Sequence, residues 1–218
     1  INHARVSSEF SLLATAADHV ATPQIRNQGT LGGNVSQDTR CQYYRSGWPC
    51  YRAGGNTCYA SAPTAMNREH AIMGTSRCVA VSPSDSAPAL IALDAQFVIQ
   101  GSGGERVVDA EDFFMRPSVD IERMTILEPG ELLTAIRIPS TWAGSTFYYE
   151  KVEDRKAWDF ALMTVASAMR VSGGVVQDVR LAANGAAPVP LRLEASERVV
   201  RGQARSDQLG IQAGEVAV

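Results

Sequence analysis

The sequence has 218 residues, of which 45% are hydrophobic and 20% are charged, and its formal net charge is −3. This composition is typical of a globular protein with one large or two small domains, and the acidic excess argues against a nucleic-acid binder. No apolar run approaches the roughly 18 residues that a membrane-spanning helix needs, so we expect no membrane span. The sequence begins INHARVSSEF, without an initiator Met or a signal-peptide pattern, and we expect an internal piece of a longer polypeptide.

The first part of the chain predicts one helix and then a long irregular region. Residues 8–20 have a Ser at the start and apolar residues at helical spacing, which predicts a helix. Residues 21–37 are predicted to form a loop, in which Gly29, Gly32 and Gly33 permit positive φ and close backbone approach. Residues 38–77 show no period of 2 or 3.6, and a loop of this length usually has a functional reason.

Regular patterns return after residue 77. The expected elements up to residue 139 are a strand at 78–81, a helix at 87–93 capped by Ser84 or Asp85, a hairpin of 95–100 with 105–110, a short helix at 109–114 and a strand at 131–139. Those that follow are a strand at 146–152, a hairpin of 160–171 with 175–184 across Ser172-Gly173-Gly174, and a helix at 193–202. The pattern is that of an α+β protein with a boundary between two lobes near Thr141.

All four cysteines of the sequence, Cys41, Cys50, Cys58 and Cys78, fall within the irregular region or at its end. Two disulfides, free thiols, a zinc ion or a shared cluster are the alternatives. A domain of this size does not need disulfides for stability, and the confinement of the cysteines to one segment favours a shared ligand. The intervals between them match no compact ferredoxin motif or zinc knuckle.

Two short motifs have both a structural and a functional interpretation. In TLGGN, Gly32-Gly33 is either a plain turn or an anion-binding nest, to which Asn34 and Ser36 add side-chain hydrogen bonds. The motif is neither GxGxxG nor a Walker A loop. In SPSD, the side chains either cap the following helix or hold a carboxylate, that of Asp85, near a polar ligand.

Four blocks, PQIRNQGTLGGN, VSPSDSAPALIALDA, GELLTAIRIP and FYYEKVEDRKAWDFALMTVASAM, together resemble the flavoprotein subunit of the molybdenum hydroxylases. That family includes xanthine dehydrogenase, carbon monoxide dehydrogenase, 4-hydroxybenzoyl-CoA reductase and bacterial aldehyde oxidoreductases, and the FAD subunit of the last group is the most similar. The resemblance implies that residues 1–141 are the second lobe of a vanillyl-alcohol-oxidase (PCMH) type FAD-binding domain. Residues 142–218 would be a small α+β C-terminal domain with an antiparallel sheet, which we expect to be truncated.

The resemblance also implies an FAD site. Its residues, carried over by position, are Ala21, Thr30, Leu31, Gly32, Gly33, Asn34, Ser36, Asp85, Leu133 and Lys151. The TLGGN residues would hold the pyrophosphate, Asp85 would contact the polar chain of the nucleotide, and Leu133 would meet the isoalloxazine through its backbone. Lys151 would lie beside the ring, where a cation stabilises negative charge on the reduced flavin, and Asp159 would organise the Lys151 strand. The alternatives are that Leu133 is a core residue and Lys151 a solvated one.

In most of the family the TLGGN and SPSD blocks are adjacent, whereas here residues 38–80 lie between them. This insertion resembles the one that holds a 4Fe–4S cluster in the 4-hydroxybenzoyl-CoA reductase and aldehyde oxidoreductase branches, which makes the four cysteines its metal ligands. Arg40, Arg45, Arg52 and Arg77 could offset the negative charge of such a cluster. Nearby aromatic residues could shield it from water, namely Tyr43, Tyr44, Trp48, Tyr51 and Tyr59.

The function implied is electron transfer through FAD to an external acceptor in a molybdenum-dependent complex of the aldehyde oxidoreductase or xanthine dehydrogenase type. Its partners would be a molybdopterin-binding large subunit, a 2Fe–2S small subunit and the missing first lobe of the FAD domain. The alternatives are a 4-hydroxybenzoyl-CoA reductase-like flavoprotein subunit and a non-enzymatic, zinc-stapled interaction module. No Ser/His/Asp or Cys/His arrangement for hydrolysis is evident, and the sequence leaves a periplasmic or cytoplasmic location open.

Overall fold

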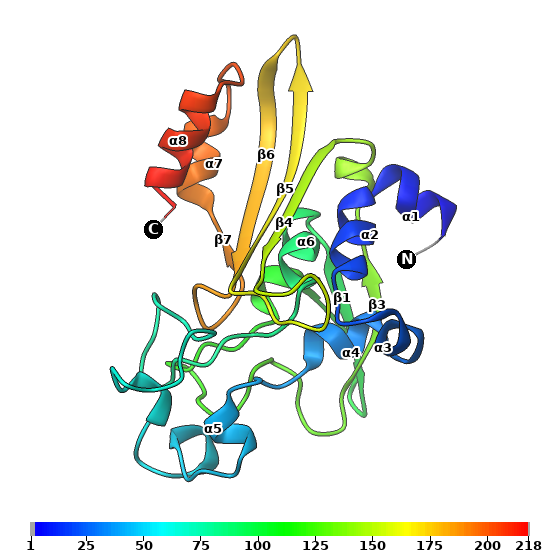
Figure 1. The fold of residues 1–218 in the computed structure, drawn as a ribbon. Coiled ribbons are helices and arrows are strands. Elements are labelled where there is room, and N and C mark those ends of the chain that lie inside the picture. The colour runs from blue at the N-terminus through cyan, green and yellow to red at the C-terminus, as the bar shows by residue number, and fades with distance from the viewer. Residues whose placement is uncertain (1–2, 218) are drawn as a thin grey trace.

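The structure is a computed structural model that describes residues 3–217, and it contains two antiparallel sheets (Figure 1). The first sheet has the strand order β2-β1-β3 and consists of β1 (Gln96–Gly101), β2 (Gly104–Asp109) and β3 (Leu132–Arg137). The second has the order β4-β5-β6-β7 and consists of β4 (Thr146–Val152), β5 (Met163–Ser172), β6 (Val175–Asn184) and β7 (Leu191–Arg192). Both predicted hairpins and both single strands at 131–139 and 146–152 are confirmed.

The helices are short and lie around these sheets. They are α1 (Ala4–Glu9), α2 (Ser11–Asp18), α3 (Pro23–Gln28), α4 (Leu31–Ser36), α5 (Gln42–Arg45), α6 (Ala87–Ala92), α7 (Glu194–Val200) and α8 (Asp207–Glu215). Single 3-10 turns occur at η1 (Tyr51–Ala53), η2 (Tyr59–Ser61), η3 (Ala110–Asp112) and η4 (Ser140–Trp142). In Figure 1, α7 and α8 lie on one side of the β5–β6 hairpin and α2 and α6 on the other, while α5 lies beyond the end of the sheet opposite the hairpin tip.

The region before residue 38 is more helical than the sequence predicts. The helix expected at 8–20 is divided at Phe10, whose φ of −134° and ψ of 47° are not helical, into α1 and α2. The loop expected at 21–37 is wrong, because it contains α3 and α4, whose caps Thr22 and Thr30 accept hydrogen bonds from the N–H groups of Ile25 and Gly33. A Thr cap satisfies a free N–H at the start of a helix.

The core crosses the boundary predicted near Thr141. Helix α6 is buried on every side, as expected of a helix that is apolar all round, and it packs against both β5 and β6. The same core contains Phe97 and Phe113 from the first sheet region and Ala166 and Ala182 from the second sheet. The two parts of the chain therefore share one hydrophobic core in this structure.

The strand expected directly after the irregular region is not formed. Residues 78–81 form no strand, and their backbone is held instead by the N–H of Ala71, which donates to the carbonyl of Val79 at 2.8 Å. After α7 the sequence analysis predicted no further helix, but α8 packs on α7 and forms a small second core with Val176, Val179 and Val200. Within residues 3–217, no helix has the length and apolar character needed to cross a bilayer.

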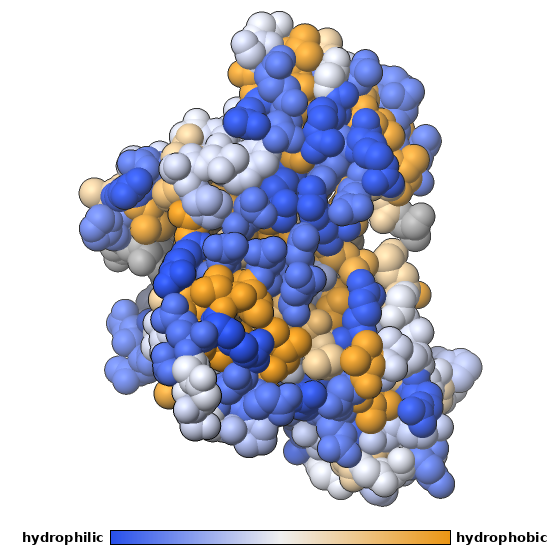
Figure 2. All heavy atoms as spheres, turned by 180° about the vertical axis from the view of Figure 1, so that it is seen from behind, coloured by the Kyte–Doolittle hydropathy of each residue, from blue (hydrophilic) through white to orange (hydrophobic). Residues whose placement is uncertain are grey.

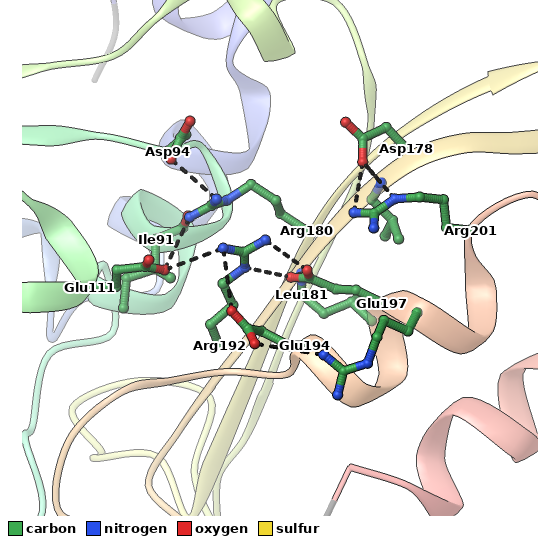
Figure 3. A network of polar contacts seen from close by, with 12 residues as sticks. Ile91, Asp94, Glu111, Asp178, Arg180, Leu181, Arg192, Glu194, Glu197 and Arg201 are labelled. Atoms are coloured by element: carbon green, nitrogen blue, oxygen red, sulfur yellow. Dashed lines mark hydrogen bonds and ion pairs between the residues drawn. The ribbon is translucent and has the colours of Figure 1, made fainter.

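Charged side chains join the second sheet to the rest of the chain (Figure 3). From β6, Arg180 donates to the carbonyl of Ile91 at 3.1 Å and pairs with Asp94 and Glu111, both at 3.2 Å. From β7, Arg192 forms two hydrogen bonds with Glu197 of α7, at 3.0 and 2.9 Å. Glu197 is 2% exposed and also accepts from the N–H of Leu181 at 2.9 Å, so it fixes α7 to two strands.

We expect Glu197→Ala to lower the free energy of unfolding by about 3 to 5 kcal/mol, because it leaves Arg192 and the Leu181 N–H without their acceptor. Urea unfolding measures the change. Glu194→Ala on the same helix is the control, since the Glu194 side chain is 61% exposed and such pairs contribute at most about 1 kcal/mol. Equal losses in the two variants would contradict the role assigned to the buried carboxylate.

Candidate functional site

Residues from the four predicted FAD-binding segments come together in the structure. At the start of α4, Gly32 lies against β3, where a Cβ on Gly32 would be 3.6 Å from the carbonyl oxygen of Leu133. The Asn34 side-chain oxygen accepts from the Ser84 hydroxyl at 2.7 Å. The residue after Ser84 is Asp85, whose carboxylate accepts from Lys151 of β4 at 3.0 Å. The TLGGN, SPSD, β3 and β4 segments therefore form one site.

The centre of this site is a buried ammonium group. The Lys151 side chain is 1% exposed, and its Nζ donates to the carbonyls of His19 at 3.1 Å and Asp159 at 2.7 Å as well as to Asp85. A second carboxylate, that of Glu153, lies 3.1 Å from Nζ and is also buried. The alternative that Lys151 is a solvated strand residue is therefore wrong.

Asp159 contacts Lys151 through its backbone only. Its carboxylate instead accepts from the N–H of Arg155 at 3.0 Å, which closes the turn after β4. The sequence analysis missed Glu153, although residues two apart on a strand share a face and EKVED therefore predicts that Lys151 and Glu153 lie side by side.

Electrostatics at this centre are dominated by burial. The pKa of Asp85 is raised to about 6. Burial is the main cause, the Lys151 ammonium opposes it, and the Glu153 carboxylate adds to it. Burial also raises the pKa of Tyr149 well above its usual range, with Asp85 and Glu153 adding to the effect, and the Tyr149 hydroxyl donates to the Asp85 carbonyl at 3.0 Å. The site thus holds a fixed cation beside a carboxyl group that changes charge slightly below neutral pH.

The glycines in and before TLGGN permit positive φ but do not adopt it in the structure. Gly32 and Gly33 lie in α4, and Gly29 has a φ of −79°. The Gly33 N–H donates to Thr30 Oγ1 at 2.9 Å, while the glycine itself is exposed, so its lack of a side chain leaves the backbone open to a ligand. One turn further, Ser36 Oγ is buried with no hydrogen-bond partner in the described chain.

Ala21 stands beside α3 in a strained conformation. Its φ is 46°, and its carbonyl accepts from the N–H of Trp158, a second residue in the left-handed region with a φ of 57°. Such backbone is uncommon for residues other than glycine. The other predicted ligand residues, Leu31 and Leu133, are half-buried. With an open glycine backbone, an unsatisfied hydroxyl and a buried cation, the residues fit a flavin nucleotide in their donor chemistry.

All four cysteines line one small cavity in the irregular segment, as their confinement in the sequence suggests. Cys50 and Cys78 are buried, Cys41 and Cys58 are half-buried, and all four are free thiols. Burial raises the pKa of the Cys41 thiol, N–H groups of Tyr44 and Tyr43 lower it, and the nearby Cys78 and Cys50 raise it. In residues 3–217, no three His, Cys, Asp or Glu side chains are placed as ligands of a single metal ion.

The enclosed space measures about 20 Å³, which is room for one water molecule. The turns that bear the thiols would have to move outward to hold a cluster. Tyr43 and Tyr59 line the cavity, and Trp48 meets Tyr59 edge-on with ring centroids 4.7 Å apart and Tyr43 at 5.3 Å. The segment is joined to the rest of the chain through Arg68, which pairs with Asp154, and Ile72, whose N–H donates to the carbonyl of Ala186.

A larger cavity, of about 440 Å³, lies between the cysteine segment and the loops of the second sheet. No TLGGN residue lines it, but it shares Asp85 with the predicted flavin-site residues and Cys41 with the cysteine cavity. Its wall also holds two polar groups that the sequence did not single out, the His70 ring and the Asn184 side-chain oxygen. Both ring nitrogens of His70 and the Asn184 oxygen are buried and have no hydrogen-bond partner in the described chain. Each is an isolated residue in the sequence, without a motif around it.

Comparison with known proteins agrees with this geometry. Residues 1–141 match the family described as the FAD binding domain in molybdopterin dehydrogenase, and residues 147–217 match the CO dehydrogenase flavoprotein C-terminal domain. The chain is 37% identical over 199 residues to the aldehyde oxidoreductase FAD-binding subunit PaoB of Escherichia coli, which covers 89% of this chain and 60% of that protein.

The medium chain of carbon monoxide dehydrogenase from Hydrogenophaga pseudoflava is 30% identical over 214 residues, with 98% of this chain and 58% of that protein covered. A solved structure of carbon monoxide dehydrogenase from the same organism matches with a TM-score of 0.70 at 29% identity, again over 98% of this chain and 58% of that one. The chain thus spans about 60% of the length of these relatives. Of these names, that of PaoB specifies FAD binding, and none mentions an iron–sulfur cluster, so the cluster remains a prediction.

The expected α+β fold, a PCMH-type FAD-binding region followed by a CO dehydrogenase flavoprotein C-terminal domain, is confirmed. The chain belongs to the family of FAD-binding domains of molybdopterin dehydrogenases.

Proposed function

We propose that this chain is part of the FAD-binding electron-transfer subunit of a molybdenum-dependent complex of the aldehyde oxidoreductase or xanthine dehydrogenase type. The observation that carries the proposal is the meeting of four sequence segments around the buried pair of Lys151 and Asp85. Relatives named as FAD-binding subunits of aldehyde oxidoreductase and xanthine dehydrogenase support it.

FAD, when bound, supplies a two-electron acceptor that passes electrons to an external acceptor. In the proposed site, Gly32 and Gly33 allow the backbone to approach the pyrophosphate, and Asn34 and Ser36 provide polar side chains. Lys151 opposes the negative charge that develops on a reduced flavin ring. Asp85 and Glu153 add negative charge next to that cation. The three side chains together would therefore set the flavin potential.

The remainder of the complex would contribute the rest of the site. Because the chain spans about 60% of its relatives, we propose that the first lobe, with a second glycine-rich loop, lies in further polypeptide, and that the molybdopterin and 2Fe–2S centres lie in partner subunits. Apolar areas interrupt the otherwise hydrophilic surface in Figure 2, and Leu132, beside the flavin-site residue Leu133, is 70% exposed. Exposed apolar area is typical of surfaces that are covered by other chains.

We further propose that Cys41, Cys50, Cys58 and Cys78 hold a 4Fe–4S cluster, as the resemblance of the insertion implies. The shared cavity, the free thiols and the aromatic lining support this ligand set. Such a cluster, when bound, carries single electrons. The surrounding residues would exclude water from it and hold the irregular segment together, because metal–thiolate bonds replace a hydrophobic core.

Gly33→Val in the full-length protein tests the flavin part of the proposal. We expect FAD content after gel filtration to fall at least tenfold, because the branched side chain covers the open backbone and a Cβ already lies 3.1 Å from Thr30 Oγ1. Gly103→Val in the β1–β2 turn is the matched control, since a Cβ there meets nothing within 4 Å. Equal FAD content in both variants would remove the TLGGN segment from the site.

A further inference from the structure

One arginine of the cysteine segment is buried with most of its hydrogen-bond donors unused. The Arg52 side chain is 1% exposed and lies in η1, between Cys50 and Cys58. Nη1 donates to the carbonyl of Glu122 at 2.7 Å, but Nε and Nη2 are buried without a partner in the described part of the chain. The nearest carboxylate, that of Asp38, is 3.8 Å from Nη1 and about half exposed.

This arrangement is unfavourable unless an anion completes it. A buried guanidinium cannot release its proton, and each unsatisfied donor carries a desolvation cost. Buried charges in proteins are accordingly paired or placed beside metal centres. A backbone carbonyl and a distant, half-exposed carboxylate do not compensate a full positive charge.

The position of Arg52 shows where the anion belongs. Arg52 lines the cavity that the four cysteines share, and the face of its guanidinium lies near the Tyr44 ring, with Cζ 5.9 Å from the centroid. The other three arginines that could offset the charge of a cluster, Arg40, Arg45 and Arg77, are exposed to solvent. The structure thus separates one arginine from three that look equivalent in the sequence.

We propose that Arg52 is the cation that compensates an anionic cluster at the four cysteines and raises its reduction potential. The inference rests on the proposed cluster and assigns a role within it. Four thiolates leave the cluster net negative, and uptake of one electron makes it more so, without any proton having to move. A fixed positive charge in a water-excluded cavity therefore stabilises the reduced state more than the oxidised state.

A redox titration of the complete complex, with dithionite as electron donor and the cluster followed by electron paramagnetic resonance, tests the inference. We expect Arg52→Gln to make reduction at least tenfold less favourable, a shift of about 59 mV to lower potential for a one-electron couple. Arg52→Lys should keep most of the wild-type potential, because it keeps the charge. Arg45→Gln, at an exposed position of the same segment, should leave the potential unchanged.

The outcomes separate the two proposals. Wild-type complex without iron in this subunit would overturn the cluster itself, whereas a retained cluster with an unchanged potential in Arg52→Gln would overturn only the role of Arg52. If Arg52→Gln loses the cluster, thermal unfolding of the iron-free protein decides. There, Arg52→Met should raise the melting temperature above that of iron-free wild type, because it removes a buried charge that lacks its anion, and a lower melting temperature would contradict the inference.

Discussion

Lys151→Met is expected to lower the free energy of unfolding by about 3 to 5 kcal/mol near pH 8, the range found when one partner of a buried ion pair is removed. The variant takes away the ammonium that lies 3.0 Å from Asp85 and 3.1 Å from Glu153. Both carboxylates then face each other in a site from which water is excluded. Lys156→Met is the natural control, because Lys156 is the other lysine of the sequence and is exposed.

The loss should depend on pH in a defined direction. The pKa of Asp85 is about 6 in the folded protein, against 3.8 for an ordinary Asp, so the folded state binds this proton more tightly than the unfolded state. The contribution of Asp85 to stability is therefore present below pH 3.8 and is lost as the pH rises to about 6. Without Lys151, which lowers the pKa of Asp85, the window extends upward, and Lys151→Met should cost more at pH 8 than at pH 5.

Urea unfolding of wild type, Lys151→Met and Lys156→Met at pH 5 and pH 8 measures these differences. A loss that is equal at both pH values, or as small as that of Lys156→Met, would show that the buried cation does not compensate Asp85. In the full-length protein with FAD bound, the same variant should also lower the flavin reduction potential, since a positive charge beside the reduced ring is gone. An unchanged potential would place Lys151 outside the flavin site without affecting the stability result.

Strands and their pairing could be predicted because their signals are local. The Gly-Gly turn between residues 160–171 and the matching segment 175–184 predicts the β5–β6 hairpin that the structure contains, although residues 160–171 could be helical by propensity. The loop prediction for residues 21–37 failed because glycine content was given more weight than capping, although Thr22-Pro23 and Thr30 are typical helix starts. Residues 78–81 have the composition of a strand but no neighbouring strand with which to pair.

The candidate site could likewise be predicted only in part. The family resemblance assigns Gly32, Asn34, Asp85 and Lys151 to the predicted site. The sequence does not show that Lys151 is buried between two carboxylates, because burial depends on how β4 packs against loops distant in the chain. Nor does it distinguish Arg52 from its exposed neighbours. Helix α8 was missed because glycines at 210 and 214 weaken its helical pattern. Packing on α7 stabilises this helix.

Cys50→Ser in the complete complex is expected to have the largest effect on the segment of residues 38–80. If the four thiols share a cluster, the variant should lose most of the iron and labile sulfide of this subunit while FAD stays bound, since the TLGGN and SPSD segments lie outside the loop. Cys50 is 8% exposed, and its carbonyl accepts from the N–H groups of Ala53 at 2.9 Å and Gly55 at 2.8 Å. Because Ser preserves this backbone geometry, the change is confined to the sulfur.

Hydrogen exchange of the same variant reports on order in the segment. Amides of residues 38–80 should exchange much faster than in wild type, because they have little regular structure of their own and metal–thiolate bonds would hold them in place. Amides of β5 and β6 should be unaffected, and Ser46→Ala, at an exposed position near α5, should change neither metal content nor exchange. Wild-type protein with zinc in place of iron would identify a zinc site. A mass increase of two protons for each bridge on reduction would identify disulfides, and either result would end the cluster hypothesis while leaving the flavin site as proposed.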